Sequence, residues 1–375
     1  MSGHVRHLYV HVPFCAHRCG YCDFVTVVGR HGEHGRYVEV LLRELELERA
    51  VLAEDIETVF LGGGTPTFLK PEALERLLGA LPHAQEVTVE ANPETVTPDL
   101  AALLRRNGVT RVSLGAQSFD PRLLEVLERG AKPDDVRRAF PWLRDAGFDN
   151  ISLDLIYGIP GQSVADLERD LDEALALEPD HLSCYELEAK PGTRFTHTFG
   201  DELARQAEAM EEYFERVVER LTGAGYRWYE TANFCRPAAP AGAVDYRAQH
   251  NLAYWHGSDY LGVGVGAVST IAGERRRNRP GLARYVAALE GGAGPPRELE
   301  QLDNDTKNTE RVLLGLRLDE PLSLAGLESA LDGAALSRLE RLGLARVGAE
   351  VDGRSLALTP RGRFLGGGVT AELLA

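Results

Sequence analysis

Three cysteines lie close together near the start of the chain. Cys15, Cys19 and Cys22 follow the spacing CxxxCxxC, directly after a short apolar segment that is typical of a β-strand. A loop of this length can turn three thiolates toward one iron–sulfur cluster, and three ligands leave the fourth iron of a [4Fe–4S] cluster open to another molecule. A zinc site is the alternative, because zinc usually takes four ligands and His11 or His17 could complete the set.

Glycines and polar residues recur where later strand patterns end. Gly62-Gly63-Gly64-Thr65-Pro66 follows the second strand pattern, and glycines there let the backbone approach a ligand closely. Further polar side chains stand at or near the ends of the next strand patterns, namely Glu90, Gln117, Arg129 and Asp154. Each alone is typical of a capped or paired surface group, but together at successive strand ends they indicate one shared site.

Alternating strand and helix patterns must position these residues. Strand patterns occur at 8–12, 56–61, 87–90, 111–119, 151–156 and 181–187, and helix patterns at 36–53, 71–81, 97–107, 134–145, 164–177 and 201–223. Six β/α units in a row predict an α/β fold with a parallel sheet, and right-handed crossovers can roll them into a partial (β/α)6 barrel. A doubly wound open sheet is the alternative, but no GxGxxG fingerprint opens a helix.

The rest of the chain reads as smaller units. A further strand is predicted at 226–234, a Pro/Ala/Gly linker at 236–242, a glycine-rich strand at 260–269 and a second linker at 291–296. A helix through Glu310 and Leu313, a helical pattern at 322–342 and a hairpin turning at Asp352-Gly353 resemble a winged-helix arrangement. We therefore expect a barrel over 1–235, an extension over 236–296 and a small α+β C-terminal module over 297–375.

Composition narrows the function classes. The chain has 375 residues, a net charge of −16 and 44% hydrophobic residues, as an ordinary globular protein does. The acidic balance argues against a nucleic-acid surface, and the basic cluster Arg275, Arg276, Arg277 and Arg279 is expected in a solvated loop. No apolar run is long enough for a membrane-spanning helix, and no signal peptide is recognised, so the cytoplasm is the expected location.

The cysteine motif and its surroundings resemble a known family. CxxxCxxC after a first strand is the signature of radical-SAM enzymes, and Tyr9-Val-His-Val-Pro-Phe-Cys15 resembles the oxygen-independent coproporphyrinogen oxidases and their relatives. The resemblance covers roughly residues 8 to 270. It implies that the amino and carboxylate groups of S-adenosylmethionine chelate the open iron. It also implies that S-adenosylmethionine is bound by Tyr9, Tyr21, Gly63, Gly64, Thr65, Glu90, Gln117, Arg129 and Asp154.

Two features distinguish among the relatives. The oxidases extend the motif to CxxxCxxCxC, whereas Phe24 stands at the position of that fourth cysteine. The segment from His250 to Trp255 fits HNxxYW, a motif similar to one in HemW-type heme chaperones. An imidazole is a good ligand for heme iron, and Tyr254 and Trp255 can pack on a porphyrin face. The resemblance thus implies heme binding by His250, Tyr254 and Trp255, with His256 as a competing ligand.

The function predicted from these features is that of a heme chaperone. It binds heme as cargo and transfers it to hemoproteins, with a [4Fe–4S] cluster and S-adenosylmethionine bound, and no catalytic residue is assigned. Recipients are expected to include respiratory, membrane-associated hemoproteins, so the protein would contact the membrane only peripherally. The alternatives are a coproporphyrinogen III oxidase, which decarboxylates propionates through a 5′-deoxyadenosyl radical, and a radical-SAM enzyme with an unrelated substrate.

Overall fold

A curved, mostly parallel sheet forms the centre of the protein. The computed structural model describes residues 4–188, 190, 193–206, 209–238, 244–350 and 353–374. Nine strands pair in the order β11-β1-β4-β5-β6-β7-β8-β10-β9. The parallel strands are β1 (His7–Val12), β4 (Thr58–Gly63), β5 (Glu86–Ala91), β6 (Arg111–Gln117), β7 (Ile151–Tyr157), β8 (His181–Glu186) and β11 (Leu261–Val263). The six predicted parallel strands are confirmed, and the sheet stays open between β11 and β9 as a partial barrel.

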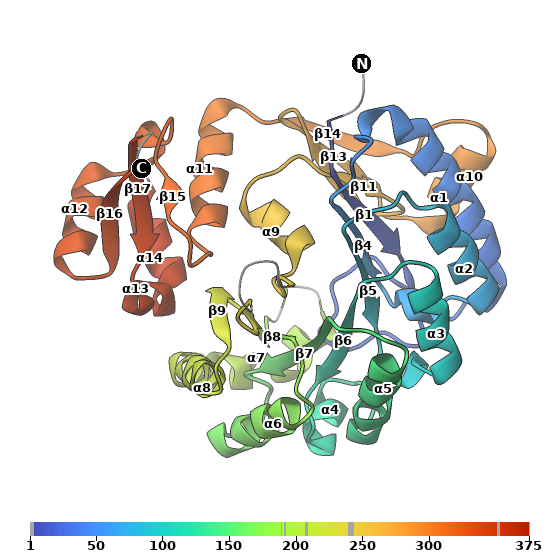
Figure 1. Cartoon of the computed structure of the whole chain (residues 1–375), viewed down its shortest axis with the longest axis horizontal. Helices are drawn as coiled ribbons and strands as arrows, with labels where there is room; N and C mark the ends of the chain where they lie inside the picture. Colours follow the sequence, from blue (N-terminus) through green and yellow to red (C-terminus); the bar gives the residue numbers. More distant parts are fainter. Residues whose placement is uncertain are drawn as a thin grey trace.

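Amphipathic helices cover the outer side of this sheet. Figure 1 shows them following one another round the curve. They are α1 (His34–Glu48), α2 (Pro71–Ala80), α3 (Pro98–Arg106), α4 (Pro121–Val126), α5 (Pro133–Asp145), α6 (Val164–Ala176) and α8 (Met210–Gly223), whereas α7 (Arg194–Gln206) packs its Phe195 in a small cluster with Tyr21. In α2, for example, Leu74 and Leu77 on one face are fully buried. They pack in one core with strand residues such as Val59 and Leu61, because parallel strands are buried on both faces.

Some predicted elements differ from the observed ones. The predicted strand at 226–234 is a hairpin of β9 (Arg227–Glu230) and β10 (Asn233–Cys235), and β10 pairs antiparallel with β8. The predicted helix at 201–223 is shared between α7 and α8, and residues 207–208 lie outside the described residues. Most of the predicted linker at 236–242 also lies outside the described residues.

The glycine-rich segment at 260–269 forms two strands instead of one. β11 pairs with β1, and β12 (Val268–Ile271) starts a second sheet with β13 (Glu274–Asn278) and β14 (Arg297–Gln301). Gly264 and Gly266 have φ values of +107° and +77°, which turn the chain between the two strands. The basic cluster is therefore mostly strand, not loop, and Arg275 is paired with Glu310.

The C-terminal module has a hydrophobic core of its own. It contains α11 (Asn304–Gly315), β15 (Leu322–Ser323), α12 (Gly333–Arg341), β16 (Ala345–Glu350), β17 (Gly353–Leu358), α13 (Pro360–Phe364) and α14 (Gly366–Leu373). The predicted hairpin is confirmed, although Asp352 lies outside the described residues. The predicted helical pattern from 322 is wrong at its start, because Leu322 pairs with Leu356 as a strand. In Figure 1 the module lies beside α9 (Gln249–Trp255), on the side away from α10 (Leu282–Glu290).

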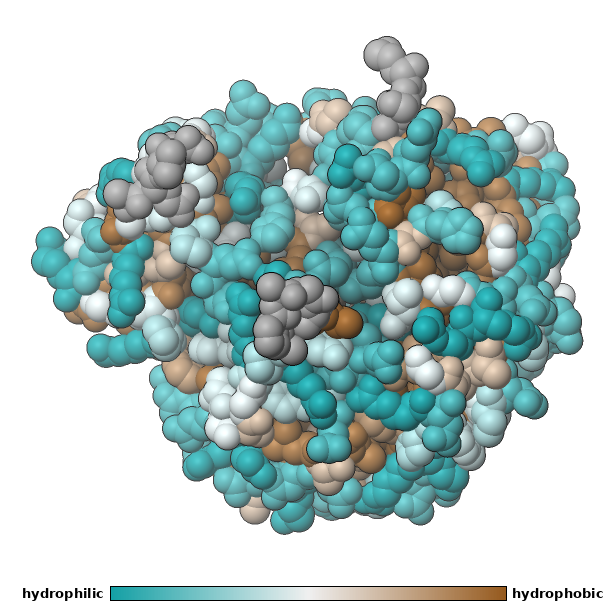
Figure 2. All heavy atoms as spheres, viewed as in Figure 1, coloured by the Kyte–Doolittle hydropathy of each residue, from teal (hydrophilic) through white to brown (hydrophobic). Residues whose placement is uncertain are grey.

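The face of the molecule drawn in Figure 2 is largely hydrophilic. Figure 2 shows polar and charged residues over most of the visible face, with hydrophobic residues in small areas between them. Among the helices in the described part of the chain, none is long and apolar enough to cross a membrane.

Candidate functional site

The three cysteines occupy a loop at the carboxyl end of β1. The loop starts in β2 (Phe14–Cys15) and returns in β3 (Val27–Val28), which pairs in parallel with β2. All three thiols are free and partly exposed. Burial raises the pKa of Cys15 to about 11, with smaller contributions from the neighbouring thiols of Cys22 and Cys19. The ligands of one cluster must lie close together, and these three thiols share one short loop.

The two histidines that could complete a zinc site have other partners. His11 Nε2 lies 2.8 Å from the carbonyl oxygen of Val25, and its Nδ1 lies 3.1 Å from the hydroxyl of Tyr9. His17 Nε2 lies 2.8 Å from the carbonyl oxygen of Glu128. Within the described residues, no three His, Cys, Asp or Glu side chains already surround a point that could hold one metal ion. Three thiols without a free fourth side-chain ligand suit an iron–sulfur cluster with one open iron better than a single zinc ion.

The glycine segment after β4 lies directly against the cysteine loop. Gly63 has φ +109°, and a Cβ there would lie 2.4 Å from a ring carbon of His11. A Cβ on Gly64 would lie 2.7 Å from the carbonyl carbon of Pro13. The Gly64 N–H also donates to the carbonyl of Val12 at 2.7 Å. Only glycine fits in this cradle, where the contacts are with the cysteine loop; a close approach of a ligand to this backbone stays a prediction.

A chain of polar side chains connects the glycine segment to the cysteine loop. The Thr65 hydroxyl donates to Cys15 Sγ at 3.7 Å and accepts from Asn92 Nδ2 at 3.2 Å. Arg129 donates through Nη2 to Asn92 Oδ1 at 2.8 Å and through Nη1 to Cys19 Sγ at 3.6 Å. The buried Nε of Arg129 has no hydrogen-bond partner within the described residues, so it is available to a bound group. The sequence pointed to Thr65 and Arg129 but not to Asn92, although Asn92 stands just beyond a strand end.

Two carboxyl groups from neighbouring parts of the sheet lie close to the same place. Glu90 on β5 accepts a hydrogen bond from the backbone N–H of Gly63 at 3.1 Å. Burial and the nearby Asp154 carboxylate raise the pKa of Glu90 to about 7. Asp154 on β7 accepts from the Ser113 hydroxyl at 2.9 Å, and burial raises its pKa as well. These oxygens are suitable acceptors for ligand hydroxyl groups.

The remaining predicted S-adenosylmethionine contacts lie around this group. Gln117 is the last residue of β6 and has φ +66°. Tyr9 is partly buried on β1, the strand that leads to the cysteine loop. Tyr21 lies within the cysteine loop, where burial raises its pKa and the charges of Arg129 and Cys19 act on its hydroxyl. The structure thus places Gln117 and Tyr21 near the carboxyl ends of the strands, whereas Tyr9 lies midway along β1, with its ring stacked on Phe60 and His250.

The HNxxYW segment lies at the opposite end of the same strands. It forms α9, whose first backbone N–H groups, those of Gln249 and His250, donate to the Glu86 carboxylate at 3.0 and 3.1 Å. His250 Nδ1 lies 2.7 Å from the Thr58 hydroxyl. Thr58 and Glu86 are the first residues of β4 and β5. The backbone of α9 therefore begins at the amino ends of β4 and β5, while the His250 ring reaches inward to Phe60, two residues before Gly62.

His250 is buried and fully hydrogen-bonded in this conformation. His250 is 1% exposed, and its Nε2 lies 2.8 Å from the Tyr254 hydroxyl. Its ring stacks on that of Phe60, with 5.2 Å between the ring centroids. Burial lowers the pKa of His250 to about 3, so the imidazole is neutral. The Arg317 guanidinium lies 4.4 Å from the centroid of the Trp255 ring. A heme iron could reach His250 only after one of the two bonded hydroxyls had moved.

A cavity of about 480 Å³ opens beside α9 at the amino ends of the strands. Its lining mixes imidazole, guanidinium, carboxylate and apolar groups, including His7, Arg105, Arg247, Leu252, His256 and Glu320. The His256 side chain is 43% exposed, and its Nε2 lies 3.4 Å from a Glu320 carboxylate oxygen. An accessible imidazole thus lies next to the predicted heme motif.

Comparison with known proteins places this arrangement in a family. The model of the radical SAM superfamily matches residues 9–174. A heme chaperone HemW of Mycobacterium tuberculosis is 39% identical, with 100% of this chain and 96% of that protein covered, and one of Bacillus subtilis is 34% identical, with 84% and 83% covered. The solved structure of the coproporphyrinogen III oxidase HemN from Escherichia coli has the same fold, with a TM-score of 0.80 over 99% of this chain and 90% of that one, at 23% identity. The chain belongs to the HemW family of the radical SAM superfamily.

Proposed function

We propose that this protein is a heme chaperone, which binds heme and transfers it to hemoproteins. Membership of the radical SAM superfamily gives it a [4Fe–4S] cluster and S-adenosylmethionine as cofactors. Heme is the cargo, in line with the heme chaperones to which the chain is similar over most of its length.

The observation that carries this proposal is the closed position of α9 together with Phe24 beside the cysteine loop. A porphyrinogen decarboxylase must hold its substrate within bonding distance of the S-adenosylmethionine radical, because reacting atoms have to meet at about 3–3.5 Å. Here the segment proposed for the tetrapyrrole, α9, begins at the amino ends of β4 and β5, and its His250 is closed off by the Thr58 and Tyr254 hydroxyls. Phe24 beside the cysteine loop is 61% exposed and offers no polar or titratable group. This arrangement supports storage and transfer of a tetrapyrrole over its decarboxylation.

The residues at the carboxyl ends fit the two cofactors. Cys15, Cys19 and Cys22 would hold three irons as thiolates. Gly63, Gly64 and Thr65 would cradle S-adenosylmethionine at the open iron, with Glu90 and Asp154 accepting from its hydroxyl groups. Arg129 would place positive charge beside the Cys19 thiolate and offer its free Nε to the bound group. When bound, such a cluster can supply one electron to the sulfonium group of S-adenosylmethionine.

We further propose that the heme iron is held by an imidazole on α9 or at its end. His250 is the motif residue, and its ligation would require release of the Tyr254 or Thr58 hydroxyl. His256 is the competing ligand, since it is exposed beside the cavity and bonded only to Glu320 among the contacts observed. Tyr254 and Trp255 would supply aromatic surface once the helix has opened.

Titration with hemin tests the proposal. Anaerobically reconstituted protein should bind hemin with a Soret band, while about four irons per chain remain in the cluster. His250→Ala should reduce heme uptake with unchanged cluster content, and His256→Ala should retain it if His250 is the ligand. His83→Ala, at an exposed residue, is the matched control. Wild-type protein that takes up no hemin would contradict the proposal.

The recipients are proposed to be hemoproteins, including respiratory, membrane-associated ones. Delivery to such recipients would take place from the cytoplasm with peripheral contact at the membrane. Mixing heme-loaded protein with an apo-hemoprotein, and following loss of its own Soret band against gain of the recipient's, measures the transfer directly.

A further inference from the structure

Gln117 ends β6 in a conformation that a side-chain-bearing residue rarely adopts. Its φ is +66°, and the Ser118 N–H donates to the carbonyl of Ala116 at 2.9 Å, which closes a γ-turn around Gln117. The pairing of β6 with β7 also shifts register between Gly115 and Gln117. Such a turn persists only where surrounding structure holds it, and strain of this kind is concentrated at binding sites.

The turn borders the cluster and cofactor residues. A Cβ on Gly115 would lie 2.8 Å from Gln117 Nε2 and 3.5 Å from an Arg129 Nη2, so the Gln117 side chain lies back over Gly115 beside Arg129. The Gly115 carbonyl accepts from Arg129 Nη2 at 2.9 Å, and Arg129 in turn reaches Cys19 Sγ at 3.6 Å. Any relaxation of the turn would move both the Gln117 side chain and the carbonyl that orients Arg129.

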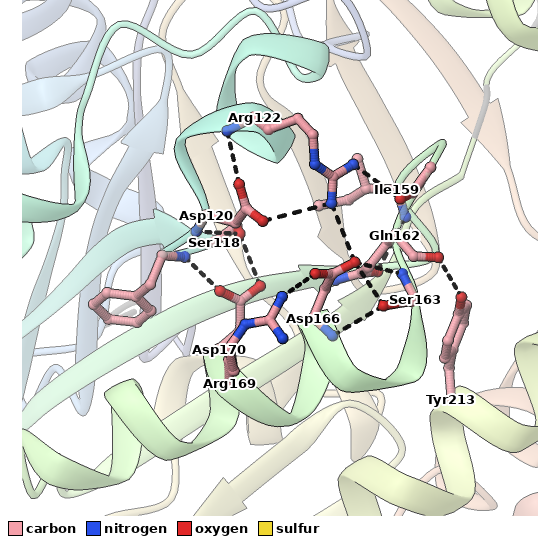
Figure 3. A network of polar contacts seen from close by, with 12 residues as sticks. Ser118, Asp120, Arg122, Ile159, Gln162, Ser163, Asp166, Arg169, Asp170 and Tyr213 are labelled. Atoms are coloured by element: carbon pink, nitrogen blue, oxygen red, sulfur yellow. Dashed lines mark hydrogen bonds and ion pairs between the residues drawn. The ribbon is translucent and has the colours of Figure 1, made fainter.

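One carboxylate on α6 holds the turn from outside the sheet. Asp170 is 2% exposed and accepts from the Ser118 hydroxyl at 2.7 Å and from the Phe119 N–H at 2.6 Å. The Ser118 hydroxyl itself accepts from the Asp120 N–H at 3.0 Å. Figure 3 shows Asp170 pointing from α6 toward Ser118, next to a second set of contacts around Asp166.

The carboxylate of Asp170 is buried without a cation. The neighbouring guanidinium groups of Arg122 and Arg169 pair with Asp166 instead. No ion pair to Asp170 occurs in the described parts of the chain. Burying an unpaired carboxylate is unfavourable, and burial raises its pKa to about 6. The buried position of the Asp170 carboxylate is unfavourable in itself, and what it contributes to the structure is two hydrogen bonds that hold the turn.

We propose that Asp170 is a positioning residue for S-adenosylmethionine, which it never touches. Through Ser118 and Phe119 it holds the turn at Gln117, and thereby fixes the Gln117 side chain and the Gly115 carbonyl beside Arg129. The inference rests on the proposed placement of S-adenosylmethionine at Gln117 and Arg129.

The test measures S-adenosylmethionine affinity by calorimetry on the reconstituted full-length protein. Asp170→Asn replaces one acceptor oxygen by an amide donor and should weaken binding at least tenfold, with iron content and hemin uptake unchanged. Asp172→Asn is the matched control on the same helix, because its side chain is 59% exposed and pairs only with Arg220. Ser118→Ala should weaken binding by a smaller factor, and Ser118→Thr, which keeps the hydroxyl, should restore it.

A second background separates positioning from a general loss of stability. Gln117→Gly adopts a positive φ freely and no longer needs the carboxylate to hold it. In that background Asp170→Asn should change the affinity by less than threefold. An equal loss in both backgrounds, or an unchanged affinity in Asp170→Asn alone, would overturn the proposal. If Asp170→Asn does not fold, the comparison of Ser118→Ala with Ser118→Thr decides it. Failure of the proposed cofactor site would be seen in the wild type, as absence of S-adenosylmethionine binding, and would overturn both proposals.

Discussion

Single residues decide whether the glycine segment can lie against the cysteine loop. A Cβ on Gly64 would lie 2.7 Å from the Pro13 carbonyl carbon and 2.8 Å from the Phe14 carbonyl oxygen, and backbone atoms cannot rotate away. We therefore expect Gly64→Ala to destabilise the protein by about 1–3 kcal/mol and to lower its iron content after reconstitution. Gly79→Ala is the control: nothing lies within 4 Å of its Cβ on α2, so it should stabilise by about 0.5–1 kcal/mol. Normal iron content in Gly64→Ala would show that the cradle tolerates a side chain.

The Glu90 carboxyl group should make stability depend on pH in an unusual direction. Its pKa is about 7 in the folded protein, above the ordinary value of about 4.3 in an unfolded chain. The folded protein therefore binds more protons than the unfolded chain between these values, and stability falls as the pH rises through this window. Glu90→Gln should remove the effect and raise the free energy of unfolding of the cofactor-free protein at pH 8, by at most about 4 kcal/mol.

Thermal unfolding at several pH values checks this prediction. The gain from Glu90→Gln should be largest at pH 8 and absent near pH 4. Glu54→Gln, at an exposed carboxylate, should show no such pH-dependent gain. At the same time Glu90→Gln should weaken S-adenosylmethionine binding, because a charged acceptor for a hydroxyl group is lost. A variant whose stability follows the wild type at every pH would show that Glu90 is not the group that titrates.

At the residue scale, the sequence identified the groups that follow each other closely in the chain or stand at strand ends. The three cysteines are local, and Gly63, Glu90 and Gln117 meet because parallel strands end at one edge. Asn92 and Asp170 were not identified, since their roles depend on partners far along the chain. Asp170 lies 52 residues from Ser118, on a helix that carries five acidic residues, so the sequence pattern does not single it out.

At the scale of elements, a small number of buried hydrogen bonds attaches α9 to the sheet. The Glu86 carboxylate accepts from the first two backbone N–H groups of the helix, and its own pKa is raised by burial. Glu86→Gln retains one acceptor oxygen and loses the charge. We expect the Gln249 and His250 amides to exchange their protons at least tenfold faster in this variant.

Hydrogen exchange with residue resolution measures this loosening, and Glu57→Gln is the control. The Glu57 side chain is 38% exposed at the same end of the sheet and pairs with Arg6. If heme ligation by His250 requires α9 to open, hemin should also bind faster to Glu86→Gln than to the wild type. Unchanged exchange at both amides would mean that the other contacts of α9 suffice to hold it.

The elements themselves were predictable where local pattern and burial agree. Six strands with apolar runs and their helices were recognised because the main core lies between them. The sequence predicts one strand over 260–269, because a glycine in an apolar run does not show whether it adopts a positive φ. The turn is seen only from the φ values of the structure. The position of α9 was not predictable, since a seven-residue helix carries too short a pattern to show which end of the sheet it covers.

At the scale of the whole molecule, the C-terminal module is joined to the sheet next to α9. Arg317 pairs with the fully buried Glu230 at 2.7 Å, and the Arg363 guanidinium lies 3.6 Å from the centroid of the Trp228 ring. Arg317 also lies over Trp255 of the proposed heme motif. Movement of the module relative to the sheet would therefore change the surroundings of the motif directly, whereas the cluster end of the strands has no part in these contacts.

The closed position of α9 and the residue at position 24 predict that the protein will not convert coproporphyrinogen III to the divinyl product. The residues at the carboxyl ends can hold a cluster and S-adenosylmethionine, so slow cleavage to 5′-deoxyadenosine is compatible with the structure. Decarboxylation needs more, because each propionate must lie against the reacting carbon of the cofactor. The proposed tetrapyrrole segment, α9, begins at the amino ends of the strands, and the apolar Phe24 stands where the oxidases that the chain resembles have an additional cysteine. Anaerobic incubation with substrate, S-adenosylmethionine and a low-potential reductant, followed by chromatography of the porphyrins, should yield no divinyl product. An oxygen-independent oxidase assayed in parallel supplies the positive control.

Multiple turnovers by this protein would mean that a porphyrinogen binds at the carboxyl ends, and would reverse the assignment from chaperone to enzyme.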